Sequence, residues 1–160
     1  MTKRPWLILA LAAAVAPTAV AQSDSGERVR VLAVVDSALA AITREDMKSL
    51  ANLMLDEALT FPITERDGVG RYRVRPREVT ITPAGEDYVE RGFDPEVRVT
   101  GAMAVVWLPY DFYRNSQWSH CGVDAFTLVR VEAGWRIATL AYTVEQPPAC
   151  RPHPDGPPRP

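Results

Sequence analysis

Three successive strand-like segments in the C-terminal half constrain the fold more than any other feature of this chain. Residues 97–144 are rich in valine, threonine and aromatic residues, and turn residues interrupt them twice. The first turn lies at Asn115 and Ser116. The second covers residues 132–134, where Gly134 suits the left-handed position of a three-residue hairpin loop. The pattern therefore predicts a meander of three long antiparallel strands.

The residues before this meander have the spacing of helices. Apolar residues recur every three or four positions from Glu27 to Ile42, which predicts one helix. Thr43 is expected to cap a second helix over residues 44–55, and a short apolar strand follows it. A third, short helix is predicted within residues 82–92. Helices followed by a long antiparallel sheet indicate a single α+β domain.

Arginine alternates with other residues over residues 71–77, where the sequence is RYRVRPR. The period of two predicts a strand with one basic face, and Pro76 marks it as an edge or a bulged stretch. Two interpretations are open, namely a ladder that binds an anion and a solvated edge that charge protects from pairing. Edges of the second kind are the commoner case.

The N-terminus has the features of a signal peptide over residues 1–21. Lys3 and Arg4 precede an apolar run, and Ala19 and Ala21 stand at the −3 and −1 positions of a cleavage site before Gln22. The run is shorter than the roughly 20 residues of a membrane span, and no lipid-anchor cysteine follows it. We therefore expect a periplasmic or secreted protein with no membrane anchor after cleavage.

The two cysteines and the C-terminal prolines define the other end of the domain. Cleavage would leave 160 − 21 = 139 residues, which suits one domain over residues 22–146. Residues 147–160 are half proline and predict an extended, poorly ordered tail. In an oxidising compartment Cys121 and Cys150 are expected to form a disulfide, which would stabilise the fold by roughly 3 to 4 kcal/mol. A metal site of both cysteines with His153 is the alternative, and the predictions include no metal and no cofactor.

Charge and motifs exclude several function classes. Without Lys3 and Arg4 the chain has 18 − 2 = 16 basic residues against 20 acidic ones, a net charge of −4. Nucleic-acid binding usually needs a basic surface, so we expect no nucleic-acid partner. The sequence also contains no phosphate-binding loop, no serine-hydrolase elbow, no zinc-protease motif and no calcium loop.

Two stretches of the chain resemble a known superfamily. The segment ALAAITREDMKSLANLMLDEALTF (38–61) and the final strand GWRIATLAYTVE (134–145) are similar to those of the nuclear-transport-factor-2-like superfamily, which includes the ketosteroid-isomerase-like and SnoaL-like proteins. The resemblance covers roughly residues 27–146. It implies a strongly curved sheet around the helices (a cone, or cystatin-like, fold) with a cavity, often in a homodimer. Some members carry acid–base residues in the cavity and others only bind a ligand or partner, so the resemblance does not assign catalytic residues.

Hairpin register predicts which side chains share a sheet face. A two-residue turn at 115–116 would place Asp111 opposite His120 and Trp107 opposite Asp124, and the second hairpin would place Asp124 opposite Tyr142. This polar set would share one face. The other face is more apolar and is expected to be the concave one that faces the helices. A β-bulge in these long strands would exchange the two faces.

These registers lead to the candidate site residues. His120 with Asp111 or Asp124 would form an acid–base group in which the nearby carboxylates raise the pKa of the histidine, although a cross-strand ion pair explains the same residues. The apolar face would line a ligand cavity with Tyr110, Phe112, Val123, Thr127 and Trp135. Three hypotheses follow: a homodimeric module that binds a small apolar ligand, an isomerase, dehydratase or cyclase that uses His120, and an interaction subunit whose pocket its own side chains fill.

Overall fold

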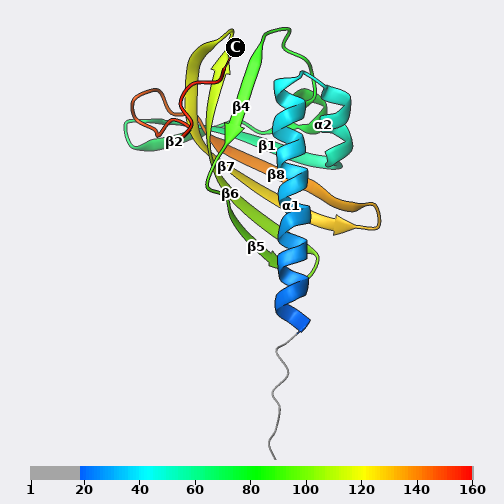
Figure 1. Cartoon of the computed structure of the whole chain (residues 1–160). Coiled ribbons are helices and arrows are strands. Elements are labelled where there is room, and N and C mark those ends of the chain that lie inside the picture. The colour runs from blue at the N-terminus through cyan, green and yellow to red at the C-terminus, as the bar shows by residue number, and fades with distance from the viewer. Residues whose placement is uncertain (1–18, 160) are drawn as a thin grey trace, which may run out of the picture.

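The structure is a computed structural model that describes residues 19–159. The predicted signal peptide lies almost wholly outside these residues, so its cleavage stays a prediction. The chain forms three helices and eight strands in the described part (Figure 1). Their bounds are α1 Ala19–Thr43, α2 Met47–Leu53, β1 Met54–Arg66, β2 Val69–Tyr72, β3 Arg75–Pro76, α3 Arg77–Thr80, β4 Tyr88–Gly92, β5 Glu96–Thr100, β6 Met103–Arg114, β7 Gln117–Val131 and β8 Gly134–Thr143.

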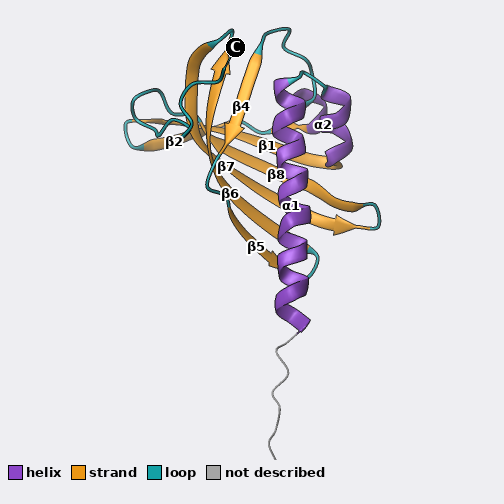
Figure 2. Ribbon diagram, in the orientation of Figure 1, coloured by secondary structure: helices purple, strands orange, loops and turns teal. Residues whose placement is uncertain are grey.

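All eight strands belong to one sheet, which curls around α1 (Figure 2). The strand order is β2-β1-β8-β7-β6-β4, with β3 also paired to β1 and β5 to β6. The predicted α+β fold with helices inside a strongly curved sheet is confirmed. The sheet is mixed, however. Strand β1 runs parallel to β8, and all the other strand pairs of the sheet are antiparallel. We call the side of the sheet toward α1 the inner face and the opposite side the outer face.

A β-bulge in the hairpin of β6 and β7 overturns the predicted faces. The turn itself is as predicted, because Arg114 pairs with Gln117 and both Asn115 and Ser116 have positive φ angles. The register then shifts between Phe112 and Tyr113, so that His120 lies opposite Phe112 and not opposite Asp111. Since side chains alternate along a strand, this one extra residue turns the β7 side chains beyond it to the other face.

The bulge changes the partners of three predicted pairs. Asp111 pairs with Cys121, Leu108 pairs with Asp124, and Val106 pairs with Phe126. The predicted pairs Asp111–His120 and Trp107–Asp124 are therefore wrong. Asp124 and His120 face inward with the apolar residues, and Asp111 faces outward.

The hairpin of β7 and β8 has the predicted register in the half farther from its turn, although the turn is one residue shorter than predicted and a bulge compensates for the difference. Val131 pairs with Gly134, one residue earlier than the sequence suggested. A second bulge between Thr127 and Leu128 then restores the expected register. The predicted pair of Asp124 with Tyr142 is confirmed, and Phe126 pairs with Leu140 as expected.

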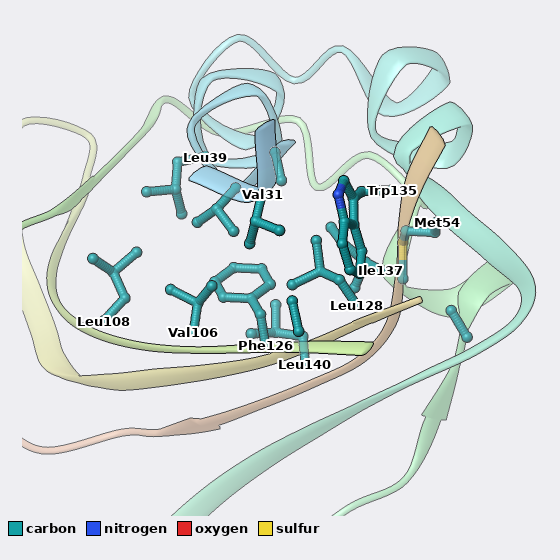
Figure 3. Packing of buried hydrophobic residues seen from close by; sticks show 14 of the residues in the cluster. Val31, Leu39, Met54, Val106, Leu108, Phe126, Leu128, Trp135, Ile137 and Leu140 are labelled. Atoms are coloured by element: carbon teal, nitrogen blue, oxygen red, sulfur yellow. The ribbon is translucent and has the colours of Figure 1, made fainter. Parts of the chain in front are cut away.

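The dry core lies between α1 and one end of the inner face (Figure 3). Val31 and Val35 of α1 are fully buried against strand residues that include Phe126 and Leu128. Burial of each such side chain contributes roughly 1.5–3 kcal/mol to folding. Trp135 closes this end of the core, and its indole Nε1 donates a hydrogen bond to the Glu27 carboxylate at 2.8 Å. The helix is thus fixed to the sheet by packing and by a polar clamp.

Two helix predictions need correction. Asp46, not Thr43, caps α2, because its Oδ1 accepts a hydrogen bond from the Ser49 amide at 3.0 Å. The helix predicted within residues 82–92 is wrong, since residues 88–92 form β4 and pair with β6. The backbone groups of this segment bond to a neighbouring strand, and such tertiary pairing overrides a local helix signal. Thr43 instead contacts β4, because its hydroxyl accepts a hydrogen bond from the Glu90 amide at 3.1 Å.

The C-terminal tail packs against the outer face. Cys121 and Cys150 form the expected disulfide, with a Cα–Cα distance of 5.9 Å. Beyond it, the His153 amide donates a hydrogen bond to the buried Asp111 carboxylate at 3.2 Å, and the imidazole packs edge-on against Phe93. The same carboxylate accepts a hydrogen bond from Arg91 Nε at 3.0 Å. The tail therefore contacts the domain beyond Cys150, whereas the sequence predicted a poorly ordered extension. None of the described helices has the length and hydropathy needed to cross a membrane.

Candidate active site

An open cavity of about 470 Å³ occupies the end of the inner face that the core leaves unfilled. Its apolar wall comes from α1, α2 and the sheet, with Ile42, Leu50, Phe112, Leu140 and Val144 among the lining residues. Its polar groups include the side chains of Glu90, Tyr110, His120 and Tyr142. A cavity of this size does not fit the hypothesis of a pocket filled by the protein's own side chains.

Two carboxyl groups meet on the inner face beneath this cavity. Glu90 of β4 lines the cavity, whereas Asp124 of β7 is 1% exposed and lies behind it. The two side chains share a hydrogen bond. Since one carboxyl must carry a proton to donate it, the pair holds at least one proton while this bond exists.

Burial raises the pKa of both carboxyls, but to different degrees. Burial raises the pKa of Glu90 to about 7, and the hydrogen bond from Asp124 works against this rise. Burial raises the pKa of Asp124 well above its ordinary value, and the charge and hydrogen bonding of Glu90 add to the rise. Asp124 therefore keeps its proton and donates it toward Glu90. Glu90, which faces the cavity, exchanges its proton near neutral pH.

Two tyrosines flank the pair on neighbouring strands. The Tyr110 hydroxyl donates a hydrogen bond to the Thr143 carbonyl oxygen at 2.7 Å, so it has no second proton to donate to a ligand. The Tyr142 hydroxyl accepts a hydrogen bond from Arg75 Nη1 at 3.4 Å and has no acceptor for its own proton among the described residues. Burial raises the pKa of both tyrosines, so both stay protonated at neutral pH. Tyr142 is the hydroxyl that remains able to donate to a ligand.

His120 lines the cavity, although its environment differs from the predicted one. Its ring stacks on Phe112 with 4.6 Å between centroids, and its Nδ1 lies 3.0 Å from the Ser119 hydroxyl. Burial lowers the pKa of His120, and the nearby Arg114 guanidinium lowers it further. The predicted rise is wrong because Asp111 lies on the outer face and Asp124 holds a proton instead of a charge.

The predicted ligand-binding residues are divided between two faces and two regions. Tyr110 and Phe112 line the cavity. Val123 and Thr127 alternate with the inward-facing Asp124 and Phe126 and thus lie on the outer face, and Trp135 belongs to the dry core. Within residues 19–159 the structure brings together no three histidine, cysteine, aspartate or glutamate side chains that could hold a metal ion.

Sequence reasoning missed Glu90, the residue that defines the site. It lies in the segment for which the sequence predicts a helix, whereas in β4 it shares a face with Tyr88 and Gly92. Apolar and polar residues do not alternate in DYVERG, so only the pairing of β4 with β6 places Glu90 beside Phe112.

Comparison with known proteins identifies the fold. Neither a protein-family profile nor a curated protein matches this sequence. Among solved structures, an NTF2-like protein with a cystatin-like fold from Novosphingobium aromaticivorans aligns with a TM-score of 0.62 and 13% identity over 78% of this chain and 86% of that one. A candidate scytalone dehydratase from the same organism gives a TM-score of 0.60 and 11% identity over 76% and 86% of the two chains.

A third neighbour is a candidate dehydratase of the NTF2-like family from Streptomyces avermitilis. It aligns with a TM-score of 0.58 and 15% identity over 76% of this chain and 97% of that one. Identities this low show the fold alone. The chain therefore has the NTF2-like cone fold, as the resemblance in its sequence implied.

The raised carboxyl pKa values predict that stability falls as pH rises. An unfolded glutamate titrates near 4.3, whereas Glu90 in the folded protein titrates at about 7. Unfolding therefore releases a proton between these values, and the free energy of unfolding decreases with pH across this window. Urea denaturation from pH 4.5 to 8 should show this slope, and Glu90→Gln should make it shallower and raise stability at pH 8.

The exposed Glu57 lies outside the cavity, so Glu57→Gln serves as the control and should keep the wild-type slope. An equal slope in Glu90→Gln and the wild type would contradict the assigned titration of Glu90.

Proposed function

We propose that the protein is an enzyme that moves a proton on a small, largely apolar molecule bound in the cavity, a reaction of the isomerase or dehydratase type. The observation that carries this proposal is the pair of Glu90 and Asp124, in which the cavity-facing carboxyl titrates near neutral pH. A general base works best when its pKa is close to the working pH. Active sites often obtain such a pKa by burial beside a second carboxyl.

Glu90 is the general base of the proposed reaction. Near neutral pH a large fraction of Glu90 is ionised. The protonated Asp124 donates a hydrogen bond that stabilises the Glu90 carboxylate. Glu90 removes a proton from a carbon next to the ligand's carbonyl group. In this proposal Glu90 takes the acid–base role that the sequence suggested for His120 with Asp111 or Asp124.

Tyr142 stabilises the negative charge that this step creates. Its hydroxyl is free to donate to the carbonyl oxygen of the ligand as the oxygen becomes an enolate. The Arg75 guanidinium donates to the same hydroxyl and places a positive charge beside it. Return of the proton to a different carbon gives an isomer, and loss of a neighbouring hydroxyl gives a dehydration. In the dehydration the hydroxyl takes up the proton that Glu90 removed from carbon and leaves as water, and the neutral His120, which lines the same cavity, can hydrogen-bond to that hydroxyl.

The reaction is tested by proton exchange at an acidic C–H bond. We expect the protein to speed deuterium incorporation next to the carbonyl of 2-tetralone in D₂O, followed by NMR, with a rate that rises with pH through about 7. Glu90→Gln should lower this rate by roughly 10²–10⁴-fold, the usual contribution of a general base. Glu57→Gln is the control, since it removes a carboxyl outside the cavity. An unchanged rate in Glu90→Gln would exclude Glu90 as the base.

A ligand-binding module without catalysis is the second candidate, and the apolar wall of the cavity favours it. Side chains such as Leu50, Phe112 and Leu140 provide contact area for an apolar body but no chemistry. The same experiment separates the two candidates. Binding of 2-tetralone with no accelerated exchange in the wild type would support the module and exclude the enzyme.

We also infer a homodimer formed through the outer face of the sheet. Met103, Val105 and Trp107 project from this side of β6, and they are 52%, 36% and 50% exposed. A row of exposed apolar side chains in the middle of a sheet is typical of a buried interface. Sedimentation velocity should give a dimer for the wild type and a monomer for Trp107→Glu. Val29→Glu, on the exposed side of α1, should remain dimeric. A monomeric wild type at micromolar concentration would exclude this interface.

We further infer that the protein is exported, and the disulfide between Cys121 and Cys150 supports this inference. The signal-peptide prediction adds a specific cleavage site before Gln22. Intact mass measurement of protein made in a secreting bacterial host should therefore give a chain that begins at Gln22, and no thiol should react after denaturation. A chain that keeps residues 1–21 and has two reactive thiols would overturn the inference.

A further inference from the structure

Three arginines from one short stretch of chain line the mouth of the cavity. Arg71 belongs to β2, Arg75 belongs to β3, and Arg73 lies between these strands. The side chains of Arg71 and Arg73 are exposed and make no hydrogen bond or ion pair with any described residue. Arg75 is partly buried and donates to the Tyr142 hydroxyl. The single strand predicted over residues 71–77 is wrong, because β2 ends at Tyr72 and Arg77 begins α3, but three of its four alternating arginines lie at the entrance to the site.

The acidic groups near the cavity do not neutralise these arginines. The Glu45 carboxylate accepts hydrogen bonds from the Gly85 and Glu86 amides at 3.0 and 3.2 Å. Glu90 is hydrogen-bonded to Asp124. A fourth lining arginine, Arg114, already forms a salt bridge of 2.7 Å with Glu86. The guanidinium groups of Arg71 and Arg73 are therefore uncompensated positive charges at the mouth.

Protection of a sheet edge does not account for this arrangement. β2 is the outermost strand next to β1, and charge on an edge is enough to discourage pairing with another chain. It does not require the charges to line a cavity. A guanidinium group presents paired N–H donors that match the two oxygens of a carboxylate, so these arginines suit an oxyanion.

We propose that the cavity takes an amphipathic carboxylate, whose anionic end binds Arg71 and Arg73 at the mouth and whose apolar body extends inward over Phe112 and Leu140. This inference rests on the proposed function, because it names the class of molecule on which Glu90 acts. It also gives the ligand one orientation. The carboxylate stays near the arginines and away from the carboxyl group of Glu90, and the reacting carbon lies in the apolar interior.

Matched ligands test the charge requirement directly. Decanoate and decanamide have the same chain and similar shape, but only decanoate is charged at pH 7.5. By calorimetry in 20 mM salt we expect decanoate to bind wild-type protein at least about tenfold more tightly, which corresponds to about 1.4 kcal/mol. The preference should shrink as salt is added, because the arginines are exposed. Arg71→Gln combined with Arg73→Gln should remove most of it.

A second pair of arginines provides the control. Arg66 and Arg98 are exposed and lie outside the cavity lining, so Arg66→Gln with Arg98→Gln changes the net charge equally and should keep the preference. Equal affinity of the wild type for both ligands would overturn the carboxylate inference and leave the cavity and the role of Glu90 intact. Loss of the preference in both double variants would also overturn it. A preference for decanoate together with unchanged proton exchange in Glu90→Gln would remove only the catalytic proposal.

Discussion

The β-bulge between β6 and β7 is the constraint on which the site depends. Without the extra residue, the side chains of Asp124 and His120 would lie on the outer face. The disulfide and the tail would then lie on the inner face. With it, β7 places Asp124 on the same face as Tyr110 and Phe112, while Asp111, which alternates with those two residues along β6, lies on the opposite face. One irregular position in β7 therefore decides that Asp124 lies on the inner face, where it meets Glu90.

The two buried aspartates show how environment determines what an acid does. Asp111 meets the Arg91 guanidinium and a tail amide, and these donors compensate a carboxylate in a structural ion pair. Asp124 meets another acid in an apolar setting, where two charges cannot both be tolerated, so it holds a proton. The first residue fastens the tail to the sheet. The second modifies Glu90, the group that faces the cavity.

The core and the cavity divide the inner face between them. Val31 and Val35 fill the space over Phe126 and Leu128, and this packing fixes α1 against the sheet. Toward the other end the side chains change to Tyr110, His120 and Tyr142 on the same strands, and the cavity opens. Stability is thus supplied at one end of the cone. The other end can therefore retain protonatable groups such as Glu90, which lower stability as pH rises.

The sequence by itself determined the α+β class, the three long strands, the turn at Asn115 and Ser116, and the two cysteines that pair. The first three depend on local periodicity and turn chemistry, which neighbouring residues encode, and the disulfide was expected because the chain has two cysteines that can pair. Only the tertiary structure decided that Glu90 lies on a strand, that it meets Asp124, and that Asp124 and His120 lie on the inner face. Those outcomes depend on pairing between segments far apart in the chain and on single-residue bulges. A register shift of one residue leaves the local pattern unchanged but reverses every side chain beyond it.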